Sequence, residues 1–279
     1  MNIVLKNIKQ LVGITENSDS IKKGKAQGEV KTLDNAYLVV RNNTIASFGP
    51  MSECPELSID SHDCAGRLVL PMYVDSHTHL VFAESRSSEM KMRLHGKSYQ
   101  EIAESGGGIL NSAAKIHAMS EQQLFDEAQE RMGNVFKQGT GAIEIKSGYG
   151  LTVEDEMKML RVIRILKSLS PTPIKATFLG AHALPEGFKD NKDAYMYLVT
   201  NEMLPRIAGE GLADYIDIFC ETGYFDLDDL KHIIEAGDKY GLKAKVHVNQ
   251  FSSFGAVKMA CEMGALSVDH LEVMKDEDF

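Results

Sequence analysis

The sequence lacks the features that would assign it to several special classes of protein. It has no tryptophan and only four cysteines, Cys54, Cys64, Cys220 and Cys261, with no C-x-x-C pair among them. In a chain of 279 residues, such scattered cysteines indicate reduced thiols in a cytoplasmic protein rather than a disulfide framework or a thiolate metal site. No run approaches the roughly 18 consecutive apolar residues of a membrane span, and the start of the chain does not resemble a signal peptide.

Positive charge is also scarce. The chain has 30 Lys and Arg against 40 Asp and Glu, which gives a formal net charge of −10. Because nucleic acids and anionic membranes are bound by clustered Lys and Arg, this balance argues against either partner. The hydrophobic content of 43% is enough to bury a sizeable core, so disordered and fibrous classes are excluded.

The hydrophobic pattern divides the chain near residue 69. Residues 1–68 contain short β-type runs separated by polar stretches, and Asn42-Asn43 between two of them is typical of a tight hairpin turn. We therefore expect a small β-sheet domain over 1–68. Residues 69–279 alternate nearly continuous apolar runs with amphipathic helical stretches, which predicts an α/β domain whose parallel sheet is buried on both faces. This pattern fits both an open sheet and a closed barrel.

The second domain is expected to contain six strands with helices between them. The predicted strands are Leu68–Val74, Ala142–Ile145, Ile174–Phe178, Tyr215–Phe219, Ala244–His247 and Ala265–Val268. The predicted helices include Ser120–Lys137, Val153–Ser168, Ala194–Ala208, Asp226–Tyr240 and Ser253–Met263, and Ser120 with Gln123 is typical of a capping box.

Histidines gather where these predicted strands end. Because the carboxyl ends of parallel strands meet at one edge of a sheet, that edge is where α/β proteins place ligands and catalytic groups. Imidazole suits Zn, Fe, Cu or Ni, and alternate histidines on one strand can reach the same ion. Five of the nine histidines of the chain occupy such positions: His77, His79, His182, His247 and His270.

Other polar residues of this edge leave two interpretations open. Glu144 and Lys146 alternate toward the end of the second strand, where they either line the site or have a structural role, as an internal ion pair or a packed Lys stem. A lone strand-end histidine, such as His182 or His270, is either functional or structural. The run Gly106-Gly107-Gly108 predicts a flexible loop rather than a phosphate cradle, because no Lys-Ser/Thr follows it.

Longer segments carry a more specific signal. Val74–Phe82 contains the His-x-His pair, Glu144–Leu151 reads EIKSGYGL, and Ala181–Pro185 reads AHALP. These segments resemble the imidazolonepropionase family of the amidohydrolase superfamily, and the resemblance covers nearly all of 69–279. Further matching segments follow in the family's order: Ser85-Arg86, Ser98–Ile102, Gly106–Ile109, Phe219–Glu221 and Ser267–Glu272.

The resemblance implies a (β/α)8 TIM-like barrel with a small N-terminal β-sandwich domain. It implies one Zn or Fe ion per chain, bound by His77, His79 and His247. The implied reaction is hydrolysis of a small molecule, 4-imidazolone-5-propanoate, to N-formimidoyl-L-glutamate in histidine degradation. Members of the family are commonly dimers, which implies a homodimer here.

The resemblance also assigns roles around the implied metal. His270 would stand beside the attacking water and move its proton, and His182 would polarise the substrate carbonyl. A propionate tail needs a cation, and the fork of an Arg side chain matches a carboxylate. The residues implied to contact substrate are Arg86, Tyr149, His182 and Gln250.

The sequence departs from the family at three points. Met72-Tyr73 replaces the Gly-Leu usual after the strand's Pro, which implies altered packing but no lost ligand. Gln250 stands where some members carry Glu; because an amide has no useful pKa, His270 is the better candidate for proton transfer. Six strand–helix units are predicted where a closed barrel needs eight, and the family's Asp ligand on the eighth strand has no counterpart here. The sequence is thus similar to a C-terminally truncated member, the front two-thirds of such an enzyme.

Two other functions stay open at this point. One is an amidohydrolase-like chain that is itself inactive and only assembles with partners. The other is a deaminase or cyclic amidohydrolase acting on a related ring.

Overall fold

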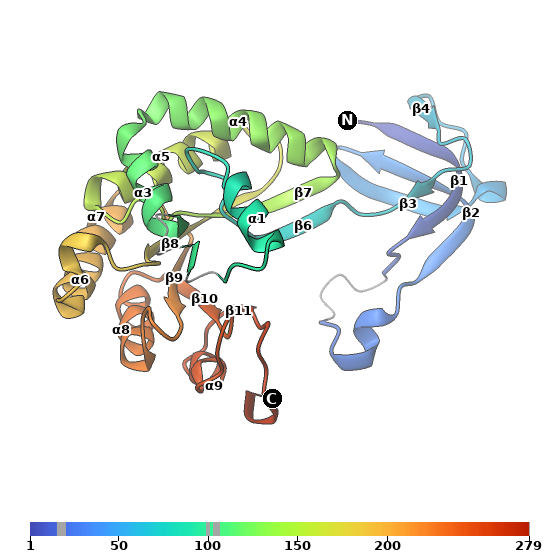
Figure 1. The fold of residues 1–279 in the computed structure, drawn as a ribbon. Coiled ribbons are helices and arrows are strands. Elements are labelled where there is room, and N and C mark those ends of the chain that lie inside the picture. The colour runs from blue at the N-terminus through green and yellow to red at the C-terminus, as the bar shows by residue number, and fades with distance from the viewer. Residues whose placement is uncertain (16–20, 99–100, 103–106, 279) are drawn as a thin grey trace. The chain divides into compact units, whose positions relative to one another are not determined.

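The chain divides into two compact units, Met1–Met72 and Tyr73–Phe279 (Figure 1). The structure is a computed structural model that describes residues 1–15, 21–98, 101–102 and 107–278. Within these residues, no helix is both long enough and apolar enough to cross a membrane.

The first unit is a five-stranded sheet in the order β3-β2-β1-β4, with β5 also paired to β1. The turn between β2 and β3 is a two-residue hairpin, because Arg41 pairs with Thr44. Asn42 and Asn43 both have a positive φ, 51° and 63°, as such a turn requires, so the predicted hairpin is confirmed. The strands are β1 (Ile3–Val12), β2 (Thr32–Arg41), β3 (Thr44–Pro50), β4 (Asp60–Asp63) and β5 (Leu68–Val69), and two short 3-10 helices span Gly24–Gly28 and Met51–Glu53.

The predicted strand Leu68–Val74 is wrong as a single element. Its first part, Leu68–Val69, pairs with β1 of the first unit, and the first strand of the second unit, β6, begins at Tyr73. Pro71 lies between the two parts. Because proline has no backbone N–H to donate to a ladder, it interrupts the strand.

The second unit contains a sheet of six strands that pair in chain order, from β6 at one edge to β11 at the other. All five pairings are parallel. Unlike a doubly wound sheet, whose strand order reverses, this arrangement keeps successive strands adjacent, as a barrel does. The strands are β6 (Tyr73–Thr78), β7 (Thr140–Lys146), β8 (Ile174–Ala181), β9 (Tyr215–Cys220), β10 (Lys243–Val248) and β11 (Ser267–His270).

Helices follow the strands and lie around the outside of this sheet (Figure 1). Capping boxes begin two of them, the predicted one at Ser120 with Gln123 and a second at Asp226 with Asp229. The α-helices are α1 (Ser87–Leu94), α3 (Gly108–Ala118), α4 (Glu121–Lys137), α5 (Val153–Leu169), α6 (Lys192–Leu198), α7 (Leu204–Gly209), α8 (Leu227–Asp238) and α9 (Ala256–Glu262). A π-turn, Val199–Met203, joins α6 to α7, and 3-10 turns span Glu186–Phe188 and Asp276–Asp278.

The two faces of the sheet differ in chemistry. Because side chains alternate along a strand, Ile216 and Ile218 of β9 pack among the helices whereas Asp217 between them points to the inner face. The same alternation in β7 places Glu144 and Lys146 on the inner face. The strands therefore carry charge inside and apolar side chains outside, which the apolar appearance of their sequences does not reveal.

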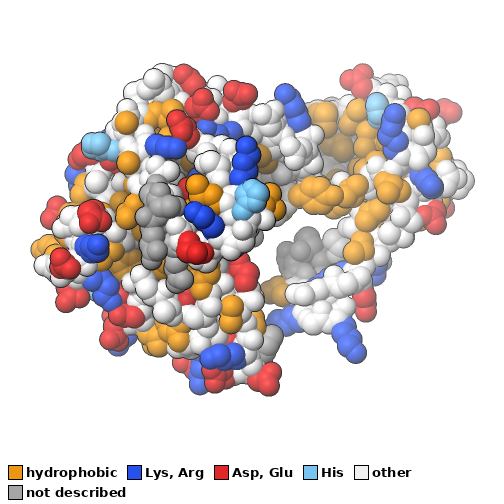
Figure 2. Space-filling view, viewed as in Figure 1, with side chains coloured by type: hydrophobic (Ala, Val, Ile, Leu, Met, Phe, Trp, Pro, Cys, Tyr) orange, Lys and Arg blue, Asp and Glu red, His pale blue; other side chains and the backbone are white. Residues whose placement is uncertain are grey.

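The outer surface is charged and mixed in sign. On the face drawn in Figure 2, Lys and Arg side chains lie among Asp and Glu.

The core beneath α5 provides a test of the packing. Leu160 is completely buried, whereas Leu169 on the same helix is 60% exposed. We expect Leu160→Ala to lower the free energy of unfolding by about 2–5 kcal/mol, because it leaves a cavity in a packed core. Leu169→Ala is the matched control and should change it by less than about 0.5 kcal/mol. Urea unfolding of both variants measures the difference, and equal losses would contradict the packing described here.

Candidate active site

The carboxyl ends of four strands bring five histidines together. The rings of His77 and His247 are 4.4 Å apart between centroids, and those of His79 and His182 stack at 5.1 Å. His270 lies 5.2 Å from His77 and 5.1 Å from His247. The structure thus places the five histidines singled out from the sequence in one cluster, with the rings close enough to share one ligand.

Three of these histidines have the geometry of a metal site. His77, His79 and His247 each offer a ring nitrogen, and these nitrogens all lie within 4.8 Å of one another. Nε2 of His79 lies 3.3 Å from Nε2 of His247. Two nitrogens bound tetrahedrally to one Zn²⁺ are about 3.3 Å apart, because each Zn–N bond is about 2.0–2.1 Å. The spacing of the two nitrogens therefore suits a common ion.

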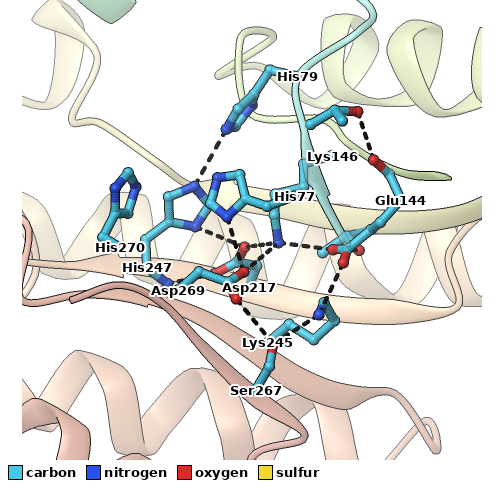
Figure 3. Close-up of polar contacts among 12 residues, drawn as sticks. His77, His79, Glu144, Lys146, Asp217, Lys245, His247, Ser267, Asp269 and His270 are labelled. Carbon is cyan, nitrogen blue, oxygen red and sulfur yellow. Dashed lines mark hydrogen bonds and ion pairs between the residues drawn. The ribbon is translucent and has the colours of Figure 1, made fainter. Parts of the chain in front are cut away.

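Carboxylates contact the other ring nitrogen of two of the three histidines (Figure 3). Nδ1 of His77 lies 3.0 Å from Oδ2 of Asp269, and Nδ1 of His247 lies 2.8 Å from Oδ2 of Asp217. The second contact is an ion-pair distance that lacks hydrogen-bond geometry, and Nδ1 of His79 has no hydrogen-bond partner among the described residues. A proton held at Nδ1 by a carboxylate leaves Nε2 with a lone pair, which is the form that binds metal.

An inner-face charge network lies beneath the histidines and consists of Glu144, Lys146, Asp217, Lys245 and Asp269. Nζ of Lys146 lies 2.8 Å from Glu144, 2.9 Å from Asp217 and 3.3 Å from Asp269. Nζ of Lys245 lies 3.0 Å from Glu144. Of the two interpretations left open for Glu144 and Lys146, the structure therefore favours the internal ion pair.

Burial and pairing shift the pKa values of this network in different directions. Burial alone would lower the pKa of Lys146, but the carboxylates of Asp217 and Glu144 raise it above its ordinary value. Burial would raise the pKa of Asp269, yet the hydrogen bond to His77 and the charge of Lys146 hold it well below its usual range. Burial raises the pKa of Asp217 despite the nearby ammonium.

His182 is held in one tautomer by the loop after β7. Its Nδ1 lies 2.8 Å from the carbonyl oxygen of Gly148, and a carbonyl only accepts, so Nδ1 carries the proton. Burial lowers the pKa of His182 to about 4, so the ring is neutral near pH 7. Its Nε2 is then an acceptor. This differs from the role expected from the sequence, because polarising a carbonyl requires a donor.

His270 is held by its own loop. Its Nδ1 lies 3.1 Å from Oε1 of Glu272, which leaves Nε2 unprotonated in the neutral ring. Its backbone φ is +83°, an uncommon conformation for a residue other than glycine, and Leu271 follows with +64°. Such backbone conformations concentrate at functional sites, where the surrounding structure imposes them.

Two buried glutamates hold the loops that carry other site residues. Glu156 of α5 accepts hydrogen bonds from the backbone N–H groups of Gly148, Gly150 and Leu151, which fixes the loop that bears Tyr149. Burial raises the pKa of this carboxyl. A Cβ on Gly150 would lie 2.3 Å from the backbone nitrogen of Glu156, so only glycine fits there.

The second of these glutamates, Glu221, follows β9 and holds the start of the loop after β10. It accepts from the backbone N–H of Phe251 at 2.8 Å and of Ser252 at 3.3 Å. This loop carries Gln250.

Sequence reasoning did not assign roles to several residues that the site uses. Asp217, Asp269, Glu156 and Glu221 are of this kind. For Asp217, the sequence did contain a signal: it is a single acidic residue within the apolar run from Tyr215 to Cys220. An acidic side chain in a buried strand needs a buried partner, so its position predicts an ion pair or a hydrogen bond inside the fold.

Two adjoining cavities open beside the histidines. One of about 150 Å³ is lined by His77, His79, Arg86, Ile109, Tyr149, His182, Phe219, His247, Gln250 and His270. The other, of about 230 Å³, is lined by His79, Phe82, Glu84, Ser85, Arg86, Ser112 and Tyr149. All the candidate site residues from the sequence therefore line the first cavity, and His79, Arg86 and Tyr149 line both.

Arg86 at the junction of the cavities is anchored by Glu89. Its Nη2 and Nε lie 2.5 and 2.7 Å from Oε2 of Glu89, while the other oxygen of Glu89 accepts from the backbone N–H of Gly108. Gly107 is the N-cap residue of α3, and Gly106, Tyr99 and Gln100 of the predicted motifs lie outside the described residues.

Comparison with known proteins gives the family. The chain is 50% identical over all 279 residues to an imidazolonepropionase of Christiangramia forsetii and to one of Flavobacterium psychrophilum, and spans 68% of each. The chain belongs to the imidazolonepropionase family. An imidazolonepropionase of a Shewanella species is 42% identical over 88% of this chain and 60% of its own length. No family model matches the chain.

Solved structures share the fold. A 5-methylcytosine deaminase from Klebsiella pneumoniae superposes with a TM-score of 0.63 at 15% identity, over 97% of this chain and 59% of its own. A guanine deaminase from C. acetobutylicum gives 0.60 at 13% identity, over 100% and 64%. The chain therefore shares the α/β fold of these structures, with a barrel-like parallel sheet and an N-terminal strand sheet, as the imidazolonepropionase resemblance implied.

The buried histidines make stability depend on pH. The pKa of His182 is about 4 in the folded chain and about 6.5 when the side chain is exposed on unfolding. Between these values the unfolded chain binds a proton that the folded chain does not, so this residue lowers the free energy of unfolding as pH falls from 6.5 to 4. The slope is at most about 1.4 kcal/mol per pH unit.

His182→Gln removes this contribution, so the unfolding free energy of the variant should depend less steeply on pH over the same window. Urea unfolding across the window measures both slopes. Indistinguishable slopes for the wild type and the variant would show that His182 is not buried in its neutral form.

Proposed function

We propose that this site hydrolyses 4-imidazolone-5-propanoate to N-formimidoyl-L-glutamate, a step of histidine degradation. The observation that supports this most is the convergence of five strand-end histidines on a cavity that also contains Arg86, in a chain of the imidazolonepropionase family. The substrate is a small molecule with a ring at one end and a carboxylate at the other. The two adjoining cavities, joined at His79, Arg86 and Tyr149, suit such a shape.

We assign His77, His79 and His247 as the ligands of one Zn or Fe ion. The support is their mutual spacing and the carboxylate contacts of His77 and His247 at Nδ1. An imidazole donor set favours Zn or Fe over Ca or Mg. When bound, such an ion supplies Lewis acidity that brings the pKa of water to about 7.

The two remaining histidines handle protons and substrate. His270 lines the cavity and has its Nδ1 held by Glu272, so its Nε2 takes a proton from the attacking water and returns it to the leaving nitrogen. His182 presents an acceptor Nε2, which suits an N–H group of the substrate ring. Both assignments rest on the contacts of Nδ1 with Glu272 in His270 and with the carbonyl of Gly148 in His182, which leave Nε2 for the cavity.

Three further residues complete the substrate site. Arg86 faces both cavities and pairs with the substrate carboxylate, because a guanidinium fork matches a carboxylate. Tyr149 and Gln250 line the ring cavity on loops held by Glu156 and Glu221. A deaminase acting on a neutral base would have no use for this cation. The homodimer and the cytoplasmic location stay predictions.

The metal assignment predicts a severe effect of one substitution. His77→Ala should remove bound Zn or Fe and lower turnover by at least about a hundredfold, because several kcal/mol of charge stabilisation are lost. Elemental analysis and chromatographic detection of N-formimidoyl-L-glutamate measure the two effects. His232→Ala, on the exposed side of α8, is the matched control and should retain metal and turnover. Unchanged turnover of metal-free His77→Ala protein would refute the assignment.

The carboxylate assignment predicts a different kinetic signature. Arg86→Gln should raise KM for imidazolonepropanoate about 10- to 100-fold, with a smaller effect on kcat, because a charged hydrogen-bond pair is lost. Arg161→Gln also breaks an Arg–Glu pair, with Glu210, but on the surface, and should leave KM unchanged. If Arg86→Gln instead leaves KM at the wild-type value, the carboxylate is bound elsewhere.

A further inference from the structure

Lys146 occupies an unusual position for a positive charge. Its side chain has no exposed surface, and its ammonium lies on the inner face of the sheet beneath the histidine cluster. It contacts three carboxylates, those of Glu144, Asp217 and Asp269. A buried charge is tolerated only when it is paired, so these contacts explain how the lysine is accommodated but not what it does.

Two of these three carboxylates also contact proposed metal ligands. Asp217 contacts Nδ1 of His247 at 2.8 Å, and Asp269 contacts Nδ1 of His77 at 3.0 Å. One ammonium therefore lies a single carboxylate away from both imidazoles, as Figure 3 shows. Without a cation between them, Asp217 and Asp269 would repel each other inside a medium of low dielectric constant.

We propose that Lys146 is a positioning residue for the metal centre, a built-in cation that holds Asp217 and Asp269 where they orient His247 and His77. This inference rests on the metal site proposed above. Carboxylates behind metal-binding histidines fix the tautomer and the ring orientation, and altering such partners typically costs about 10- to 100-fold in metal affinity. Lys146 acts on the metal only through these carboxylates.

Lys245 provides an internal comparison. Its side chain is also almost completely buried and belongs to the same inner-face charge network. It contacts Glu144 at 3.0 Å and Oγ of Ser267 at 2.7 Å. Among the described residues, its ammonium makes no ion pair with Asp217 or Asp269. The two lysines thus share burial, charge and one partner, and differ in whether they touch the carboxylates behind the histidines.

Two double variants isolate this difference. Lys146→Met with Glu144→Gln and Lys245→Met with Glu144→Gln each remove one positive and one negative charge, so both have the same net charge as the wild type. Zn²⁺ affinity is measured on the metal-free full chain by competition with a chromogenic chelator. We expect the first variant to bind Zn²⁺ about 10- to 100-fold more weakly than the wild type, and the second to remain within about threefold.

A spectroscopic readout separates positioning from simple destabilisation. In ¹⁵N NMR spectra of the metal-free chain, Nδ1 of His77 and His247 should be protonated in the wild type and in the Lys245 variant, and should become a mixture of tautomers in the Lys146 variant. Equal Zn²⁺ affinities for the two double variants would overturn the proposal, and so would equal tautomer populations. If the Lys146→Met variant does not fold, Lys146→Gln with Glu144→Gln replaces it and must still bind Zn²⁺ at least threefold more weakly than the Lys245 variant.

The same titration distinguishes this proposal from the metal assignment. If the wild type and His77→Ala bind Zn²⁺ equally, the metal assignment itself fails. If His77→Ala loses Zn²⁺ while the two double variants bind it equally, only the role of Lys146 fails.

Discussion

The pairing of charges buried on the inner face of the sheet is the interaction on which the second unit depends. Helices pack on the outer face of the sheet through apolar side chains. Because side chains alternate along each strand, the residues at every second position lie on the inner face. Those positions supply Glu144, Lys146, Asp217, Lys245 and Asp269. Each of these five side chains forms an ion pair with a side chain of opposite charge. Two of the four strands involved, β10 and β11, also carry a histidine of the cluster, His247 and His270. The ion pairs that allow these charges to be buried therefore also position Asp217 and Asp269 against the imidazoles of His247 and His77.

Carboxylates have a second use around the site, which is to hold loops. Glu156 accepts three backbone N–H groups of the loop after β7, and Glu221 accepts two from the loop after β10. Asp278 accepts hydrogen bonds from Asn249, Ser253 and the backbone of Lys275, which ties the same β10 loop to the segment after β11. Loops fixed in this way keep their side chains at defined positions, which a site needs before substrate arrives.

Local signals in the sequence were sufficient for several elements. The Asn42-Asn43 turn and the capping box at Ser120 depend on residues a few positions apart, so their geometry is encoded where they occur. The prediction of one strand over Leu68–Val74 was wrong because the apolar residues continue across Pro71, whereas the backbone on either side of Pro71 pairs with a different sheet. The expected role of His182 changed because its tautomer is set by the carbonyl of Gly148, a partner 34 residues away.

The sequence by itself determined the alternation of strands and helices, the placement of five histidines at strand ends and the resemblance to one enzyme family. These properties depend on periodicity and on short motifs. Only the tertiary structure decided that strands pair in chain order rather than as a doubly wound sheet, which ring nitrogens engage carboxylates and carbonyls, and that Lys146 links Asp217 to Asp269. Each of these depends on atoms from strands far apart in the chain, and no local pattern specifies which distant partner a buried charge will meet.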